Sequence, residues 1–322
     1  ALNALPRIWV RLDIAPSRFV PGGLQAHAPL GALPLYYRWQ APGVLPGDFA
    51  TTRLHLAGLS GRLRQAVLAD DAPATFAACT DILTWGGERN RHNGARPSLA
   101  YWAEWLPQYL HNCSRTMTLA TAALKEDMRV SGVPAMSSML SKVHSLLAID
   151  GLPIYDSRVA GAIATVVETW RQCTGLTSEP LPPELTFFAV PPHPARTVSA
   201  RFPCAETPGV LRYGEIRTRA YWCGAMVRLG WLLQLMLGKK STPGAMRAME
   251  GALFMAGYNC AGIAQPLPGT SHAPFAEGRS AGVSTVSGPA YRALITSSGK
   301  PTLTDFKSER YASASLVDRW LQ

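Results

Sequence analysis

The stretch MSSMLSKVHSLLAIDGLPIYDSRV, residues 136–159, decides how the middle of this 322-residue chain folds. Two serines near its start are residues that cap helix N-termini, and apolar residues then follow at helical spacing. Gly151 and Pro153 end that helix, because glycine and proline commonly mark helix C-termini. A second helix is expected to begin directly after Asp156. The stretch therefore predicts two helices joined by a short connection.

Asp156 is the residue of this stretch with two different interpretations. A carboxylate at a helix start is stabilised by the positive end of the helix dipole and accepts backbone N–H bonds, so one interpretation is a helix N-cap. The other interpretation is a catalytic carboxylate. The position of Asp156 alone does not separate the two.

Segments with apolar residues at helical spacing follow one another through most of the chain. Proline, glycine or polar residues separate these segments. They lie near residues 59–69, 73–85, 99–111, 114–129, 138–149, 157–171, 216–237, 243–256 and 308–321. We therefore predict a mainly α-helical fold, with two packed helical lobes around a basic cleft.

The same pattern divides the chain into three regions. Residues 1–58 contain short β-favouring runs, Ile8-Trp9-Val10 and Leu35-Tyr36-Tyr37, among many prolines and glycines, which predicts an N-terminal extension with short strands. Residues 59–260 are the predicted helical body. Residues 261–322 are predicted to form a long loop, rich in Gly, Ser and Pro, and a C-terminal helix that packs on the body.

The composition is that of a globular protein with a polyanionic partner. Hydrophobic residues make up 47% of the chain and charged residues 16%, which excludes disorder as the dominant state. Lys and Arg total 31 against 21 Asp and Glu, a net charge of +10, and 25 of the basic residues are Arg. Because guanidinium groups bind phosphate bidentately and release its counterions, DNA is the expected partner. A basic but otherwise ordinary protein is the alternative.

Several other classes of protein and site are not expected. The six cysteines lack a C-x-x-C pair, which is typical of reduced thiols in a cytoplasmic protein. The most apolar stretch, residues 225–237, contains Arg228 and is too short to span a bilayer. Glu88 and His92 lack a third partner for a metal, and no nucleotide-binding glycine loop is present. We expect a cytoplasmic protein without membrane contact, cofactor or obligate protein partner.

Aromatic and basic residues next to a glycine pair are candidates for contact with a base and with phosphate. Trp85 precedes this pair, and Arg89, Asn90 and Arg91 follow it. Such a turn can present an indole to a base and guanidinium groups to phosphate. A core position for Trp85 is the alternative interpretation.

The Ser141-Lys142 pair near the head of one short helix, followed by Tyr155-Asp156-x-Arg158-Val159 at the head of the next, resembles the helix-hairpin-helix DNA glycosylase superfamily. The matching region covers roughly residues 130–165. The resemblance implies that Asp156 is the catalytic carboxylate and that Lys142 matches the nucleophile of bifunctional members. It also implies that a base is flipped into a pocket and its N-glycosidic bond is hydrolysed, which leaves an abasic site.

Two features depart from the family pattern. The family hairpin contains two glycines that let backbone amides approach a phosphate, whereas residues 131–138 offer only Gly132. The interval from Lys142 to Asp156 is also shorter than in members with a lysine nucleophile. We therefore predict a monofunctional enzyme, in which Lys142 meets a DNA phosphate or a neighbouring carboxylate.

The predicted function is base excision from duplex DNA, on a modified or damaged base. A hypermodified phage base, removed in phage defence, is one option. The alternative is a noncatalytic nucleic-acid-binding protein on the same scaffold, in which Asp156 only caps a helix. Besides the catalytic candidates Asp156 and Lys142, the residues expected to contact DNA or the flipped base are Trp85, Arg89, Asn90, Arg91, Ser138, Ser141, Tyr155, Arg158, Arg217 and Arg219.

Overall fold

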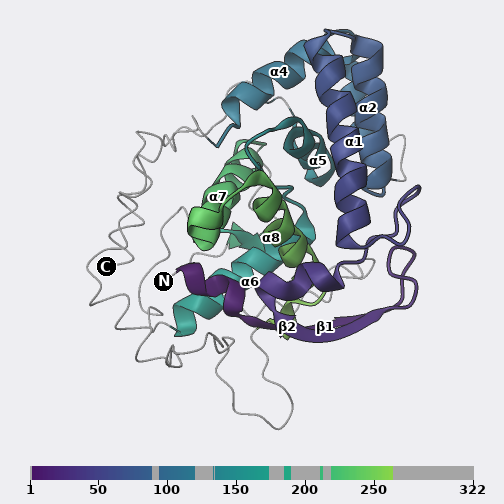
Figure 1. Ribbon diagram of the computed structural model, residues 1–322. Coiled ribbons are helices and arrows are strands. Elements are labelled where there is room, and N and C mark those ends of the chain that lie inside the picture. The colour runs from purple at the N-terminus through teal and green to yellow at the C-terminus, as the bar shows by residue number, and fades with distance from the viewer. Residues whose placement is uncertain are drawn as a thin grey trace.

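The computed structural model describes residues 2–88, 94–119, 133, 135–173, 185–189, 211–212 and 219–263. Over these residues the chain is mainly helical, with a small two-stranded sheet near the N-terminus (Figure 1). This confirms the predicted mainly α-helical fold with short strands near the N-terminus. Of the loop and C-terminal helix predicted for residues 261–322, residues 264–322 lie outside the described residues.

The N-terminal region is a β-hairpin between two short 3-10 helices. Its elements are η1 (Leu2–Arg7), β1 (Trp9–Ile14), β2 (Leu24–Pro29) and η2 (Leu30–Tyr36). The strands pair antiparallel, with Trp9 opposite Pro29 and Ile14 opposite Leu24. Alternate residues of β1 are buried, as expected for a strand with one face on the core.

The strand prediction is right for one run of this region and wrong for the other. The Ile8-Trp9-Val10 run leads into β1. The strand expected at residues 35–37 is instead the end of η2 and its C-cap. The reason is Pro34, whose fixed φ suits a 3-10 turn and which has no N–H for a strand ladder.

Two long antiparallel helices follow, α1 (Phe49–Leu68) and α2 (Ala72–Trp85). Asp48 caps the first by accepting the Thr51 N–H at 2.8 Å, and Asp71 caps the second by accepting the Ala74 N–H at 2.9 Å. Helix α1 thus begins earlier than the apolar pattern from residue 59 predicted, and the expected boundary after residue 58 falls inside it.

The next predicted helix, residues 99–111, is broken in the structure. It corresponds to α3 (Ala95–Tyr101), η3 (Ala103–Trp105) and α4 (Leu106–Thr116). Pro107 sits in the first turn of α4, where a proline is tolerated and favours a new helix start. Residues 120–132, which held most of the next predicted helix, lie outside the described residues.

The central stretch folds as the sequence predicted, into α5 (Ser138–Leu147) and α6 (Ser157–Cys173). Ser137 caps α5 by accepting the Leu140 N–H at 3.2 Å. Helix α6 is buried on nearly all sides, which is typical of a helix at the centre of a core. The remaining elements are β3 (Phe188–Ala189), paired in parallel with β4 (Leu211–Arg212), then α7 (Arg219–Leu237), η6 (Gly238–Lys240), α8 (Pro243–Ala256) and η7 (Cys260–Gly262).

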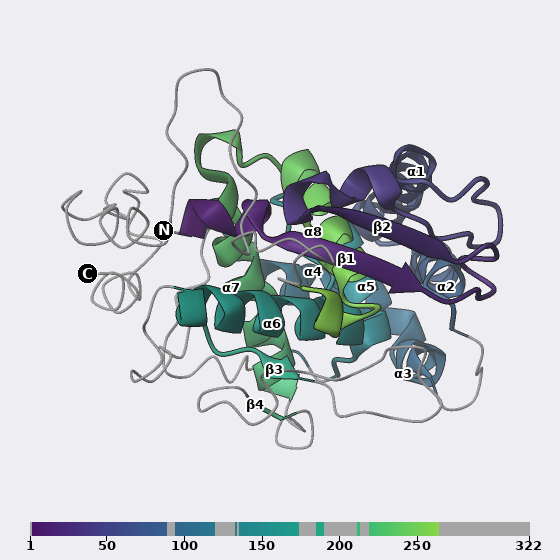
Figure 2. The same ribbon diagram turned by 90° about the horizontal axis from the view of Figure 1, so that it is seen from below.

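Helix α5 lies between the two groups of helices. Figures 1 and 2 show the α1–α2 pair on one side of it and α6, α7 and α8 on the other, with the β1–β2 hairpin passing near α8. The hairpin shares the core of the helices, because η2 packs on α8 and Val10 forms a bridge with Ile263. The N-terminal region therefore forms part of the same core that surrounds α8. None of the helices in the described part of the chain is long and apolar enough to cross a membrane.

Candidate active site

The connection between α5 and α6 is held by side-chain hydrogen bonds from α5 itself and from α7. Ser145 on α5 donates to the Leu152 carbonyl at 2.6 Å, and Ser141, one turn earlier, accepts the Tyr155 N–H at 3.3 Å. From α7, the Trp222 indole N–H donates to the Tyr155 carbonyl at 3.0 Å. These bonds satisfy buried backbone groups on both sides of residue 154 and so fix the backbone that leads into Asp156.

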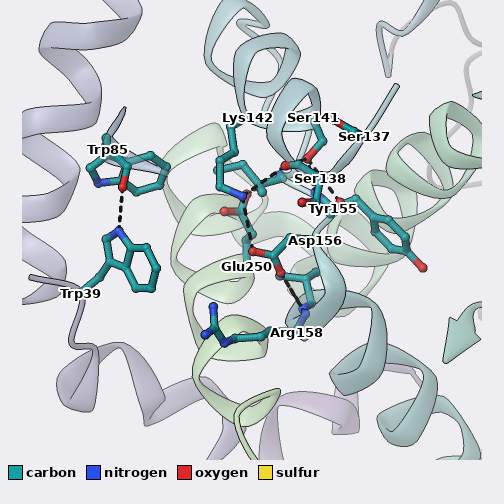
Figure 3. Close-up of polar contacts among 12 residues, drawn as sticks. Trp39, Trp85, Ser137, Ser138, Ser141, Lys142, Tyr155, Asp156, Arg158 and Glu250 are labelled. Carbon is teal, nitrogen blue, oxygen red and sulfur yellow. Dashed lines mark hydrogen bonds and ion pairs between the residues drawn. The ribbon is translucent and has the colours of Figure 1, made fainter. Parts of the chain in front are cut away.

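The two carboxylate oxygens of Asp156 have different partners (Figure 3). Oδ1 accepts the backbone N–H groups of Arg158 at 3.0 Å and Val159 at 3.1 Å, which is a helix N-cap on α6. Oδ2 lies 3.5 Å from the Nζ of Lys142, and the side chain is 9% exposed. The cap therefore uses one oxygen and leaves the other directed toward the lysine.

Lys142 is a buried lysine, with 5% of its side chain exposed. Its Nζ donates to the Ser138 carbonyl at 3.1 Å and faces Asp156. Burial lowers the pKa of Lys142, and Arg158 acts in the same direction, although the attraction of Asp156 opposes both. Gly86 is needed for this placement, because a Cβ there would lie 2.7 Å from the Lys142 Cδ.

These groups line a cavity of about 120 Å³ that opens beside α5, α6 and α8. This volume is well above the roughly 10–15 Å³ that one water molecule needs. Its polar wall, as we name it, consists of Lys142, Asp156 and Arg158. Its aromatic wall consists of Tyr37, Trp39, Trp85 and Phe254.

The aromatic wall combines residues that are far apart in the sequence. The Trp39 indole N–H donates to the Trp85 carbonyl at 3.1 Å, and Phe19 stacks on Trp39 with ring centroids 3.6 Å apart. Phe254 meets Trp39 edge to face at 5.3 Å. The N-terminal region therefore supplies one side of the cavity.

Arg158 extends from the start of α6 over this aromatic wall. Its guanidinium carbon lies 4.2 Å from the ring centroid of Tyr258 and 5.0 Å from that of Phe254. Among the described residues none accepts a hydrogen bond from the guanidinium, and its buried Nε is unsatisfied. The side chain thus offers hydrogen-bond donors inside the cavity.

Glu250 also lines the cavity and was not among the site residues predicted from the sequence. Its Oε2 accepts the Ile154 N–H at 2.8 Å and pairs with Arg247 on the same helix. Burial raises the pKa of Glu250, and the charge of Asp156 raises it further. A glutamate among the apolar residues of α8 was the signal that could have found it, because a glutamate is rarely fully buried unless it is paired.

The structure divides the predicted DNA contacts into three groups. Trp85, Ser138 and Arg158 line the cavity beside Asp156 and Lys142. Trp85 is only 5% exposed, so it is both a core residue and part of the aromatic wall. The remaining predicted residues are either buried elsewhere or outside the described part of the chain.

Two predicted contacts are part of the protein interior instead. Tyr155 is 0% exposed and packs edge to face on Trp222, and Figure 3 shows its side chain pointing away from Asp156. Ser141 is also fully buried and holds the Tyr155 backbone. Their physical role is to position the connection. The side chains of Arg89, Asn90, Arg91, Arg217 and Arg219 lie outside the described residues.

Within the described ranges, no group of three His, Cys, Asp or Glu residues is arranged to hold a metal ion. No protein-family model, no curated protein and no solved structure matches the chain. The chemistry of the cavity therefore carries the functional argument.

Proposed function

We propose that this protein is a DNA N-glycosylase, which flips a modified or damaged base into the cavity and hydrolyses its N-glycosidic bond. The observation that carries the proposal is the arrangement of Asp156. This residue caps α6 with one oxygen and presents the other, beside Lys142, to a cavity lined with indole rings. Such an arrangement combines a fixed anion with a surface on which a base can stack.

The chemistry requires a fixed negative charge. Breaking an N-glycosidic bond builds positive charge on the deoxyribose, and a carboxylate held near that centre stabilises it or activates a water. Two backbone N–H groups hold the Asp156 carboxylate, so little reorganisation is needed when the charge develops. This preorganisation is the property that electrostatic catalysis needs.

The aromatic wall fits a flipped base. Stacking of a base on an aromatic side chain contributes about 1–3 kcal/mol, which offsets part of the cost of removing the base from the duplex. Trp39 is held in place by Phe19 on one face and by its hydrogen bond to Trp85. Arg158 then supplies donors for a base edge or a phosphate.

Duplex DNA is the proposed partner. The chain carries a net charge of +10, and 25 of its 31 basic residues are Arg, which favours phosphate contacts. We place the DNA across a basic cleft between two helical lobes, with the α5–α6 connection at its base. The proposed substrates include hypermodified phage bases, for which phage defence would be the biological role.

We further propose that the enzyme is monofunctional. Lys142 meets a neighbouring carboxylate, which was one of the two contacts expected for it, and its Nζ also bonds the Ser138 carbonyl. In this role the ammonium group orients Asp156 and balances its charge. Because burial lowers the pKa of Lys142, a nucleophilic role is the competing hypothesis, and a borohydride-trapped adduct separates the two.

Base release from a panel of DNAs tests the proposal. Wild-type protein is incubated with genomic DNAs that carry different modified bases and with oxidised and alkylated DNA, and the released bases are identified by mass spectrometry. We expect one class of base to be released and abasic sites to appear in equal number. Release of no base from any DNA would contradict the proposal.

One observation favours a second candidate function. Asp156 does cap α6, and this contact is sufficient to explain a buried aspartate at that position. A noncatalytic nucleic-acid-binding protein on the same scaffold would bind the DNAs of the panel and release no base. The same experiment therefore distinguishes the two candidates.

A further inference from the structure

Glu250 is the second carboxyl group of the cavity, and its role rests on the proposed function. It enters from α8, whereas Asp156 enters from the start of α6 (Figure 3). The residue is 6% exposed. A carboxyl group in such a place is either fully paired within the protein or available to a bound molecule.

The two oxygens of Glu250 are not equivalent. Oε2 accepts the Ile154 N–H at 2.8 Å and the guanidinium of Arg247. Oε1 receives no hydrogen bond from any residue that the structure describes. Since a carboxylic acid keeps one oxygen as an acceptor, Oε2 retains both partners when a proton sits on Oε1. Oε1 is therefore the oxygen that would carry a proton in the neutral form.

The charged and titratable groups around Glu250 come from several elements. Arg247 lies on its own helix, Lys142 on α5, Asp156 before α6, Arg158 in the first turn of α6, and Tyr37 directly after η2. Burial has the largest effect and favours the neutral form of Glu250, as does Asp156, whereas Arg247, the Ile154 N–H and Lys142 favour the ionised form. The net effect is a raised pKa of Glu250.

Asp156 and Glu250 thus share a cavity but differ in how their two oxygens are held. Asp156 accepts two backbone N–H groups with Oδ1 and faces Lys142 with Oδ2, whereas both partners of Glu250 lie on Oε2. Two carboxyl groups in such different environments are suited to different roles, one as an anion and one as an acid.

We propose that Glu250 is a further catalytic residue, which donates the proton on Oε1 to the departing base. A base leaves more easily as a neutral molecule than as an anion, and protonation by a positioned acid contributes typically about 100- to 10,000-fold. After donation the Glu250 carboxylate keeps its two partners on Oε2, which stabilise the new charge.

The proposed step is balanced in atoms and electrons. The bond between C1′ and the base nitrogen breaks, its electron pair stays on the base, and the proton moves from Oε1 to the base. A water oxygen then bonds to C1′ and gives up one proton, which returns to Glu250 directly or through Asp156. The products are the free base and the abasic sugar, and no oxidant or reductant is consumed.

Glu250→Gln is the informative variant. The amide oxygen of glutamine can accept from Ile154 and Arg247 in place of Oε2, so the variant preserves the anchoring contacts while removing the acid. Glu104→Gln is the matched control, because Glu104 is an exposed residue of η3.

Two measurements test the role. Infrared difference spectra of the free protein, taken as wild type minus Glu250→Gln, report the carboxylic-acid carbonyl band of Glu250. Single-turnover base release, measured against pH on the DNA that the panel identifies, reports its catalytic effect. The spectra need no substrate, so they remain informative even if no base is released from any DNA.

We expect the acid band of Glu250 to persist at a pH where an ordinary glutamate is ionised. We expect Glu250→Gln to lower base release by about 100-fold and to remove the decline of the rate at high pH, with Glu104→Gln unchanged. Absence of the acid band at that pH, or a variant within a few-fold of wild type, would overturn the role. Failure of the wild type on every DNA would instead refute the proposed function, and the catalytic role with it.

Discussion

The polar wall and the aromatic wall of the cavity are built in different ways. Lys142, Asp156 and Arg158 come from one continuous stretch, so their relative positions depend on two helix starts and one connection. Trp39, Trp85 and Phe254 come from three separate parts of the chain and meet through the Trp39–Trp85 hydrogen bond and the ring contact of Trp39 with Phe254. A single short stretch therefore fixes the charged groups of this site, whereas the shape of its pocket depends on the whole fold.

Gly257→Ala should push the end of α8, with the aromatic wall, away from Arg158 in the polar wall. This substitution should have the largest effect on stability. Gly257 follows α8, and a Cβ there would lie 2.1 Å from the Arg158 carbonyl oxygen, a backbone atom that cannot move aside. We expect the free energy of unfolding to fall by about 3 kcal/mol, as for overpacking in a core. Urea unfolding measures this change in the free energy of unfolding.

The control for this substitution is Gly58→Ala, in α1, where a Cβ would meet nothing within 4 Å. Alanine is the better helix former, so this change should raise stability by about 0.5–1 kcal/mol. Equal effects of the two substitutions would mean that the contact between α8 and Arg158 does not hold the walls together.

The second prediction concerns His144, on α5 beside the polar wall. Burial lowers the pKa of His144 to about 4, from 6.5. The unfolded chain therefore binds a proton between pH 6.5 and about 4 that the folded chain does not, so folding stability present above pH 6.5 is lost as the pH falls toward 4. The loss amounts to about 3 kcal/mol by pH 4.

His144→Phe should remove this part of the pH dependence, because it keeps an aromatic ring against Tyr109 without a titrating nitrogen. The measurement is urea unfolding at pH 7 and pH 5 for both proteins. If the free energy of unfolding changes with pH by the same amount in both proteins, His144 is not a buried neutral residue.

Trp39→Leu tests the aromatic wall. The change removes the stacking surface and the hydrogen bond to the Trp85 carbonyl, while Asp156 and Lys142 keep their own contacts. We expect substrate binding to weaken roughly tenfold, from the loss of about 1–2 kcal/mol of base stacking, with the single-turnover rate at saturation within a few-fold of wild type.

Trp9→Leu is the matched control, because Trp9 stacks on His27 in the β1–β2 hairpin and does not line the cavity. Substrate binding should be unaffected by Trp9→Leu. A Trp39→Leu protein that binds normally but has lost its rate would place Trp39 with the catalytic groups instead of the pocket.

Lys142→Gln should lower the rate less than the substitutions of Asp156 and Glu250 do. The α6 cap of Asp156 does not involve Lys142, so the carboxylate keeps its two backbone partners. We expect a roughly tenfold lower rate, with no covalent adduct when substrate and borohydride are added to either protein. Lys239→Gln, at an exposed lysine of η6, is the control.

An adduct that forms with wild type and disappears in Lys142→Gln would make the lysine a nucleophile. The enzyme would then be bifunctional, and strand cleavage would follow base removal. This outcome would leave the Asp156 assignment intact but change the role of its partner.

The polar wall was the part that the sequence could predict. Serine caps, the apolar stripe and the Gly151 and Pro153 breaks are local signals, and they correctly placed α5, α6 and the start of α6 at Asp156. The mainly helical fold and β1 followed from similar local patterns. Signals of this kind act over a few residues, so they do not depend on how distant segments pack.

The aromatic wall could not be predicted in the same way. Trp85 was selected, but nothing near Trp39 or Glu250 in the sequence indicates that each lies beside Asp156. Tyr155 was expected to contact DNA because it precedes Asp156, yet the extended connection turns its side chain toward Trp222. Long-range packing decides which side of such a connection faces a cavity.

Single-turnover base release by Asp156→Asn tests the catalytic role of Asp156 directly. The amide oxygen can still accept from the Arg158 and Val159 N–H groups, so α6 keeps its cap and DNA binding should persist. The proposed charge beside the sugar is lost, and we expect the rate to fall at least about 100-fold. Asp81→Asn, at a surface carboxylate 56% exposed, should match wild type. A folded, DNA-binding Asp156→Asn protein that releases base within a few-fold of the wild-type rate would show that Asp156 is not the catalytic carboxylate.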